Sequence, residues 1–240
     1  MRFFAAGITK SDYAKELMSA NPATWTKADI APTDTPLLTL KDMTISRGNK
    51  ELFSGLNITL HAGQAVGLIG DSGIGKSSLG DAICGLITPS KGVMTWHTKP
   101  KRHQVLKLYQ DPPSAFAQNI TLGTLIDDVV KRHSLDKSQI APLMQALQLH
   151  PDLLNRTSQN VSGGELQRIA IMRALMMKPV LLFADEVTNR LDLITQKTTL
   201  DLLTHACRTQ NCTLVMVSHD HDLTRHYCDT VVDLTDYKRG

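Results

Sequence analysis

One eight-residue segment, GDSGIGKS at 70–77, constrains the fold of this chain more than any other feature. It fits the pattern GxxxxGK[ST] and directly follows the apolar run AVGLI (65–69). A plausible amphipathic helix, SSLGDAICGL (77–86), comes after it. A strand, a glycine-rich loop and a helix in this order form a phosphate-binding loop. The sequence therefore predicts an α/β protein with a phosphate site at one edge of its sheet.

The residue types in this loop suit the phosphate chain of a nucleotide. Glycines let successive backbone N–H groups point inward at phosphate oxygens, and the following helix directs its positive end at the same anion. Lys76 is expected to reach the β- and γ-phosphates, and Ser77 to give its hydroxyl to Mg²⁺. The alternative, a glycine-rich turn with an unrelated lysine, does not explain the order of strand, loop and helix. The residues predicted to bind nucleotide here are Gly70, Asp71, Ser72, Gly73, Ile74, Gly75, Lys76, Ser77 and Ser78.

Two further apolar runs, VLLFAD (180–185) and TLVMVSH (213–219), also end in polar residues, as buried parallel strands do at a ligand site. The carboxyl ends of such strands are expected to meet. We expect Asp185 to hold the Mg²⁺ shell and Glu186 to polarise an attacking water. An acidic pair can also simply cap a strand, but the presence of a phosphate loop in the same chain favours the catalytic interpretation.

Composition excludes several other classes of protein. With 42% hydrophobic and 20% charged residues in 240, the chain can build a sizeable core, so disorder as its main state is excluded. No apolar run approaches the roughly 18 residues that span a bilayer, and the apolar start is too short for a secretory signal. A net charge of +3 does not demand nucleic acid, and no nucleic-acid partner is expected. Four cysteines without a CxxC pair indicate reduced cytosolic thiols.

The first 36 residues differ in texture from the rest. SDYAKELMSA (11–20) favours a short helix capped by Ser11, and the stretch 21–36 contains three prolines and little periodicity. We interpret 1–36 as an extension and linker. From Leu37, the runs 37–45 and 56–63 alternate as a half-exposed antiparallel sheet does.

A second motif, VSGGELQR (161–168), resembles the LSGGQ signature of the ATP-binding subunits of ABC transporters. The order of the other motifs is also similar to that family from Leu37 onward: the phosphate loop, Gln110, VSGGE, VLLFADE, the DEVTNRLD turn (185–192) and His219. The resemblance implies an α/β fold with a P-loop NTPase (RecA-like) core, an antiparallel β subdomain and a helical signature subdomain. Residues 37–240 would form this ABC ATPase domain, with the core and β subdomain in 37–110 and 161–240 and most of the helical subdomain in 111–160.

The signature opens a predicted helix at 163–177, so its N-terminal amides form an anion site with no phosphate of its own in this chain. Without the resemblance, the segment could be merely a helix cap. The resemblance implies that two subunits, identical or related, pack head to tail and that each signature closes on the ATP held by the other. The residues assigned to this contact are Ser162, Gly163, Gly164 and Glu165.

Three further residues receive roles from the resemblance. Gln110 ends the apolar run VLKLYQ (105–110) and would coordinate Mg²⁺ or water, and His219 would donate to the γ-phosphate. Arg47 stands at about the place where the family stacks an aromatic residue on adenine. Its guanidinium plane could lie on the base instead, or Phe53 could reach in.

Within the family, QDPPSAFAQNITLG (110–123) and DEVTNRLDL (185–193) resemble the peptide and nickel importer branch. This resemblance implies an ATP-binding and ATP-hydrolysing importer subunit at the cytoplasmic face of the inner membrane, for a peptide, nickel or metal-chelate cargo. Its partners would be a second ATPase subunit, two transmembrane permease subunits that contact the helical patterns at 122–132 and 140–149, and an extracytoplasmic substrate-binding protein. Alternatives are the ATPase of an exporter, a soluble ABC machine, or a module that binds ATP without hydrolysis.

Overall fold

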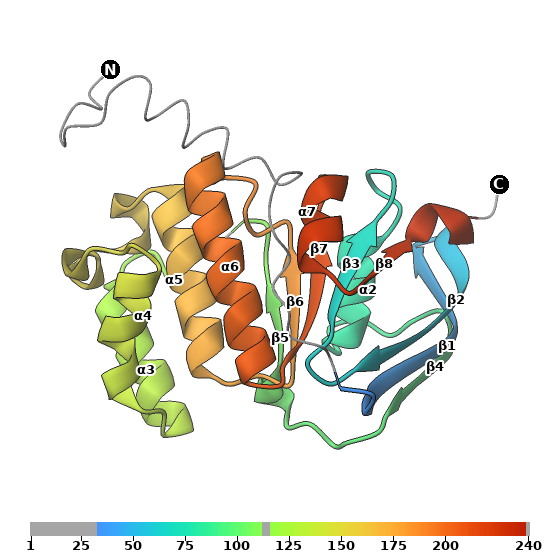
Figure 1. Cartoon of the computed structure of the whole chain (residues 1–240), viewed down its shortest axis with the longest axis horizontal. Coiled ribbons are helices and arrows are strands. Elements are labelled where there is room, and N and C mark those ends of the chain that lie inside the picture. Colours follow the sequence, from blue (N-terminus) through green and yellow to red (C-terminus); the bar gives the residue numbers. More distant parts are fainter. Residues whose placement is uncertain (1–32, 112–115, 239–240) are drawn as a thin grey trace.

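A five-stranded parallel sheet forms the centre of the molecule (Figure 1). The computed structural model describes residues 33–111 and 116–238, so the helix expected at 11–20 lies outside the described residues. The strands lie in the order β5-β6-β7-β3-β8 and pair in parallel throughout. Their bounds are β3 (Ala65–Ile69), β5 (Val105–Leu108), β6 (Leu181–Asp185), β7 (Thr213–Val217) and β8 (Thr230–Asp233).

The central strands are buried on both faces, which explains their continuous apolar sequences. Alternate residues of each strand enter different cores. Leu182 and Met216 pack into the core shared with the larger helices, whereas Phe183 and Val215 pack into the core beneath the antiparallel sheet. The sheet therefore separates two hydrophobic cores.

A second, antiparallel sheet lies at one end of the molecule, in the order β2-β1-β4 (Figure 1). Its strands are β1 (Pro36–Arg47), β2 (Lys50–His61) and β4 (Lys91–Trp96). The sequence predicted the first strand and only the second half of the next one. Both strands continue into the hairpin turn at Gly48, whose φ of 58° suits glycine. The half-exposed alternation is present, because only one face of this sheet covers a core.

The helices cover the parallel sheet and extend to the end opposite the antiparallel sheet (Figure 1). They are α2 (Lys76–Ile83), α3 (Leu122–His133), α4 (Ile140–Ala146), α5 (Gly163–Met176), α6 (Leu193–Thr209) and α7 (His221–Tyr227). Shorter 3₁₀ turns occupy Arg102–Gln104, Lys137–Gln139, Pro151–Asn155, Ser158–Asn160 and Leu234–Tyr237. Across 33–111 and 116–238, none of these helices is both long and apolar enough to cross a membrane.

The helix expected at 140–149 ends early, at Ala146. Gln148 adopts a left-handed conformation with a φ of 52°, and the Leu149 N–H donates to the Met144 carbonyl at 2.8 Å. This bond closes the helix end in the manner of a C-terminal capping motif, while Leu147 and Leu149 remain buried. The apolar pattern of the sequence thus extends to Leu149, although the helix itself ends at Ala146.

One close approach fixes the phosphate-loop helix on the sheet. A Cβ added to Gly80 of α2 would lie 2.4 Å from the ring of Phe183 on β6. Only glycine permits this packing without displacing the buried ring. The contact brings α2 directly against the strand that ends in Asp185.

Candidate nucleotide site

The carboxyl ends of neighbouring parallel strands bring most of the predicted polar residues to one hollow of about 350 Å³, although Asp185 lies behind it and is not part of its lining. The loop after β3 supplies most of its wall, and single residues come from beyond β5, β6 and β7. Gly70, Asp71 and Ile74 of the predicted stretch do not line this hollow but belong to the same loop. The lining residues are Arg47, Leu52, Ser72, Gly73, Gly75, Lys76, Ser77, Ser78, Gln110, Glu186 and His219.

The loop between β3 and α2 curls tightly around the amine of Lys76. Its Nζ donates to the carbonyl oxygens of Gly70, at 2.7 Å, and Asp71, at 3.0 Å. Gly75 immediately precedes the helix with a φ of 112°, and a Cβ there would meet Phe53 at 3.1 Å. The lysine therefore holds the loop in a fixed curvature and places its charge in the hollow.

Glu186 lies at the centre of a hydrogen-bonded cluster opposite the loop. Its Oε2 accepts from Gln110 Nε2 at 2.8 Å and from Asn189 Nδ2 at 2.6 Å. Its Oε1 lies 2.7 Å from His219 Nε2. The backbone of Glu186 is left-handed, with a φ of 51°, and this turn directs the side chain away from the strand into the cluster. Three of the residues expected at the γ-phosphate thus already contact one another.

Asp185 faces a different neighbour, a buried lysine that the sequence analysis did not identify. Lys107 Nζ on β5 lies 3.1 Å from Asp185 Oδ2 and 2.8 Å from Asp81 Oδ1, and it donates to the Ser77 carbonyl at 2.9 Å. Burial acts to lower the pKa of Lys107, but its bonds with Asp81 and Asp185 outweigh burial and raise that pKa. The group is therefore a fixed positive charge.

Arg47 lies on the wall of the hollow, as expected for a contact with a base. Its Nη2 donates to Asp81 Oδ2 at 3.1 Å and its Nε to Ser78 Oγ at 3.2 Å, so the guanidinium is anchored on α2. Phe53, the other candidate, is fully buried behind Gly75 and does not line the hollow. Only Arg47 of the two is placed to meet a ligand in this hollow.

The signature residues do not reach this hollow in the same chain. Ser162 caps α5 through a capping box, in which its backbone N–H donates to Glu165 Oε2 at 2.8 Å and its Oγ accepts from the Glu165 N–H at 3.2 Å. The Glu165 carboxylate also accepts from Ser162 Oγ at 2.7 Å, and the two bonds that Ser162 donates to it lower the pKa of Glu165. Gly163 packs against the guanidinium of Arg190, which pairs with Asp111 at 2.8 Å. The signature therefore forms a separate surface with a positive helix end and an arginine.

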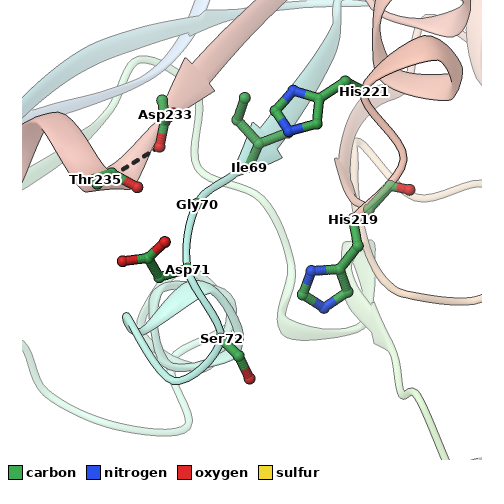
Figure 2. A pocket seen from close by; sticks show the side chains of 9 residues that line it. Ile69, Gly70, Asp71, Ser72, His219, His221, Asp233 and Thr235 are labelled. Atoms are coloured by element: carbon green, nitrogen blue, oxygen red, sulfur yellow. Dashed lines mark hydrogen bonds between the residues drawn. The ribbon is translucent and has the colours of Figure 1, made fainter.

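A second hollow of about 310 Å³ adjoins the phosphate loop (Figure 2). In Figure 2, Asp233 and Thr235 lie on one side of the loop, and His219 and His221 lie on the other. Asp233 Oδ1 accepts from the Thr235 N–H at 2.8 Å. His219 and Ser72 line both hollows.

The residues assigned to Mg²⁺ suit that ion. They offer a hydroxyl from Ser77, a carboxylate from Asp185 and an amide oxygen from Gln110, and hard divalent cations prefer such oxygen ligands. The Gln110 amide nitrogen faces Glu186, which leaves its oxygen for a cation. Nothing in this donor set favours a softer metal.

Lys107 and Asn189 are the contributors that the sequence analysis missed. The signal for Lys107 was present, since it is the only charged residue in the apolar run VLKLYQ. Asn189 entered the sequence analysis only as part of the segment DEVTNRLDL that resembles the importer branch, although it lies three residues from Glu186 in a turn. The hydrogen bond between Asn189 and Glu186 depends on the left-handed backbone at Glu186, and no sequence pattern predicts that conformation.

Solved structures support the class of fold that this geometry defines, an ATP-binding cassette. A dimeric ATP-binding cassette in a post-hydrolysis state, bound to ADP and Pi, superposes with a TM-score of 0.72 at 21% identity, covering 82% of this chain and 94% of that chain. CbiO1 from Clostridium perfringens, part of the ABC transporter complex cbiONQ, superposes with a TM-score of 0.71 at 21% identity, covering 83% of this chain and 85% of that chain. The α/β fold with an added antiparallel sheet is therefore confirmed.

Sequence relatives give the family. The ABC transporter family model matches residues 53–189, more than half of the chain. The oligopeptide transport ATP-binding protein OppF of Haemophilus influenzae is 31% identical over 194 residues, covering 74% of this chain and 58% of that protein. The nickel import ATP-binding protein NikE of Pseudomonas putida is 31% identical over 203 residues, covering 78% and 74%. The chain belongs to the ABC transporter family, with similarity to its peptide and nickel importer branch, and it spans about 58% of the length of OppF.

Proposed function

We propose that this chain is the ATP-binding and ATP-hydrolysing subunit of an ABC importer. The observation that carries the proposal is the single hollow in which a phosphate loop faces Glu186, Gln110 and His219. A protein that only bound nucleotide would not need a carboxylate held opposite the loop. The family membership agrees with this assignment.

ATP would bind with its phosphates in the loop. The backbone amides from Gly73 to Ser78 would surround the β-phosphate at the start of α2, where the helix dipole favours an anion. The amine of Lys76 would exchange its two loop carbonyls for phosphate oxygens, which are stronger, charged acceptors. Arg47, anchored by Asp81, would lie against the adenine.

Hydrolysis would follow from the release of Glu186. Mg²⁺ held by Ser77, Asp185 and Gln110 would neutralise charge on the β- and γ-phosphates. His219 would turn from Glu186 to donate to the γ-phosphate, which would free one carboxylate oxygen to orient a water and accept its proton, while Gln110 and Asn189 would continue to hold the other oxygen. The water oxygen bonds to the γ-phosphorus as the bond to the β–γ bridging oxygen breaks, giving ADP and inorganic phosphate.

The signature surface would complete the site of a second subunit. Its helix end has no phosphate partner in its own chain, and it lies away from the hollow. Two subunits packed head to tail would place Ser162, Gly163, Gly164 and Glu165 of each on the γ-phosphate held by the other. ATP would thus hold the two subunits together, whether they are two copies or two related chains.

Transport would require membrane partners. The segment 111–160, which includes α3 and α4, would contact two transmembrane permease subunits at the cytoplasmic face of the inner membrane, and residues 37–240 would move as the ATPase unit. An extracytoplasmic binding protein would deliver the cargo. The names of the relatives favour a peptide, nickel or a metal chelate as that cargo.

Glu186→Gln tests the proposal most directly. The variant keeps the size and most hydrogen bonds of the side chain but cannot accept a proton, so ATP hydrolysis should fall about 100-fold or more while ATP affinity stays within about threefold. Hydrolysis is measured as phosphate release and binding by calorimetry, with Glu51→Gln on exposed β2 as the matched control. Normal turnover in Glu186→Gln would remove Glu186 from the reaction.

A further inference from the structure

A buried positive charge lies directly behind the proposed metal site. The side chain of Lys107 is only 4% exposed, and its three acceptors, on Ser77, Asp81 and Asp185, match the three hydrogens of an ammonium group. The rings of Tyr109 and Phe183 lie 5.4 and 5.6 Å from the same nitrogen. The lysine is therefore held on all sides, and its charge has a fixed position.

Two of these three partners belong to residues assigned to Mg²⁺. Lys107 contacts the backbone of Ser77 and one carboxylate oxygen of Asp185. Lys107 contacts Oδ2 of Asp185, so the other carboxylate oxygen, Oδ1, would be the one to meet a metal. The Lys107 ammonium group thus contacts two of the residues assigned to the metal, Ser77 and Asp185.

The charges around this position explain why such a lysine matters. Asp81 and Asp185 have side chains that are 17% and 7% exposed, so two carboxylates lie largely out of water behind the loop. Without a cation they would repel each other and attract any divalent ion. Lys107 offsets one of the two charges, and exposed Arg47 adds a further contact to Asp81.

We propose that Lys107 is the resident counter-charge of the magnesium site: it positions Asp185 and the first turn of α2 before the metal arrives, and it weakens the attraction of this site for a free divalent cation. The metal would then be held firmly only when a triphosphate adds its own negative charge. This inference rests on the proposed function, because it concerns the metal site of that reaction. Lys107 acts through Asp185 and is a positioning residue.

The test measures the binding of Mn²⁺ to the nucleotide-free full-length chain, by electron paramagnetic resonance. Lys107→Met removes the charge and keeps the length of the side chain, so Mn²⁺ affinity should rise on the order of tenfold. Lys107→Arg keeps the charge and should remain within about threefold of the parent. A purely structural salt bridge predicts the opposite sign, since a disordered Asp185 would bind Mn²⁺ more weakly. Unchanged or weaker binding in Lys107→Met would overturn the proposal.

A second pair of variants protects the test against misfolding. Lys107→Met alone leaves two buried carboxylates unpaired, whereas the double variant with Asp81→Asn removes one charge of each sign. The double variant should bind Mn²⁺ on the order of tenfold more tightly than Asp81→Asn alone, and equal affinity in the two would also overturn the proposal. ATP binding in the presence of Mg²⁺ is measured on the same proteins. Its absence in the parent would contradict the proposed function, while the Mn²⁺ comparison would still decide the role of Lys107.

Discussion

The phosphate-loop end and the signature end of this chain carry the same kind of anion-binding device in different states of completion. At the first, α2 opens beneath a loop whose amine, carboxylate, amide and imidazole partners all come from the same chain. At the second, α5 opens with a capping box between Ser162 and Glu165, and the Arg190 side chain lies beside Gly163. We call the phosphate loop with α2 and its facing residues the enclosed half, and the signature with the start of α5 the outward half.

This difference teaches how a single chain could contain both halves of the proposed reaction without performing it alone. In the proposed dimer, the enclosed half would hold the groups that bind phosphate and orient water, while the outward half would supply a helix dipole, a hydroxyl group and a capped helix end to the other subunit's ATP. Charge stabilisation can be delivered by a second molecule, but the position of the attacking water must be set by residues fixed to the loop. The predictions below test that division, from the largest effect to the smallest.

Lys76→Ala should disable ATP binding at the phosphate loop of the enclosed half. Loss of the charged hydrogen bonds from its amine to phosphate should weaken ATP binding by about 100-fold or more, measured by calorimetry. The matched control is Lys238→Ala, because Lys238 also contacts the loop, at Asp71 across 3.4 Å, but from an exposed side chain. Its ATP affinity should stay within about twofold. Equal losses in both variants would mean that the general positive charge, rather than the position of Lys76, binds the nucleotide.

Ser162→Arg should abolish the outward half and leave the enclosed half intact. In a Glu186→Gln background, the variant should bind ATP normally yet form no ATP-dependent dimer, because the arginine blocks the signature surface. Lys76→Ala should also form none, since it cannot hold ATP. In a mixture of the two, the phosphate loop of the Ser162→Arg chain and the signature of the Lys76→Ala chain form one complete site per pair. The mixture should therefore recover dimers, detected by light scattering, with one bound nucleotide for every two chains. Where the Glu186→Gln chain by itself forms an ATP-dependent dimer, a mixture that stays monomeric would contradict the head-to-tail arrangement; where the pair consists of two related chains, the same mixture is made with the related chain.

How much of this comparison was readable in the sequence depends on the range of the contacts. The order of strand, loop and helix at 65–83 was predicted, because local patterns specify each of its parts. The early end of α4 was not, because it is set by one left-handed residue, Gln148, in an otherwise helical pattern. A turn of this kind costs little locally, so periodicity cannot reveal it.

The same limit applied within the site. Residues at strand ends were predicted to meet, because the topology of an open sheet requires it. The contact between Lys107 and Asp81 was not predicted, because it joins β5 to α2 across 26 residues. The residues next to a lysine in an apolar run do not indicate which distant acid it pairs with. Long-range pairing of buried charges depends on the final packing of two elements, and one sequence carries no direct sign of it.

Arg47→Ala sharpens the comparison at the base end of the enclosed half. If the guanidinium lies on adenine, ATP affinity should fall about three- to tenfold. Arg47→Lys keeps a charge near Asp81 but loses the plane, and it should lose nearly as much as the alanine variant. Calorimetry with ATP compares the three proteins. Unchanged affinity in Arg47→Ala would show that the base is held elsewhere.

The smallest effect concerns the charge that orders the outward half. Glu165 has a pKa below its usual 4.5 because Ser162 donates to its carboxylate from its backbone and hydroxyl groups. A depressed folded pKa means that the stabilisation is present above the unfolded pKa and is lost as the pH falls through the folded value. The parent should therefore lose stability below about pH 4.5 that Glu165→Gln does not lose, by less than about 1 kcal/mol.

Urea unfolding at a series of pH values from 7 to 3 measures this difference. Glutamine retains an acceptor for the capping box but not the charge, so the parent should be the more stable protein at pH 7, by less than about 1 kcal/mol, and the two should converge as the parent becomes protonated. Glu51→Gln on β2 removes a surface carboxylate outside the signature and corrects for the loss of one titrating group. A stability difference between parent and Glu165→Gln that does not change with pH would show that the carboxylate charge does not order the signature, and that its surface is shaped by the hydrogen-bond geometry of Ser162 alone.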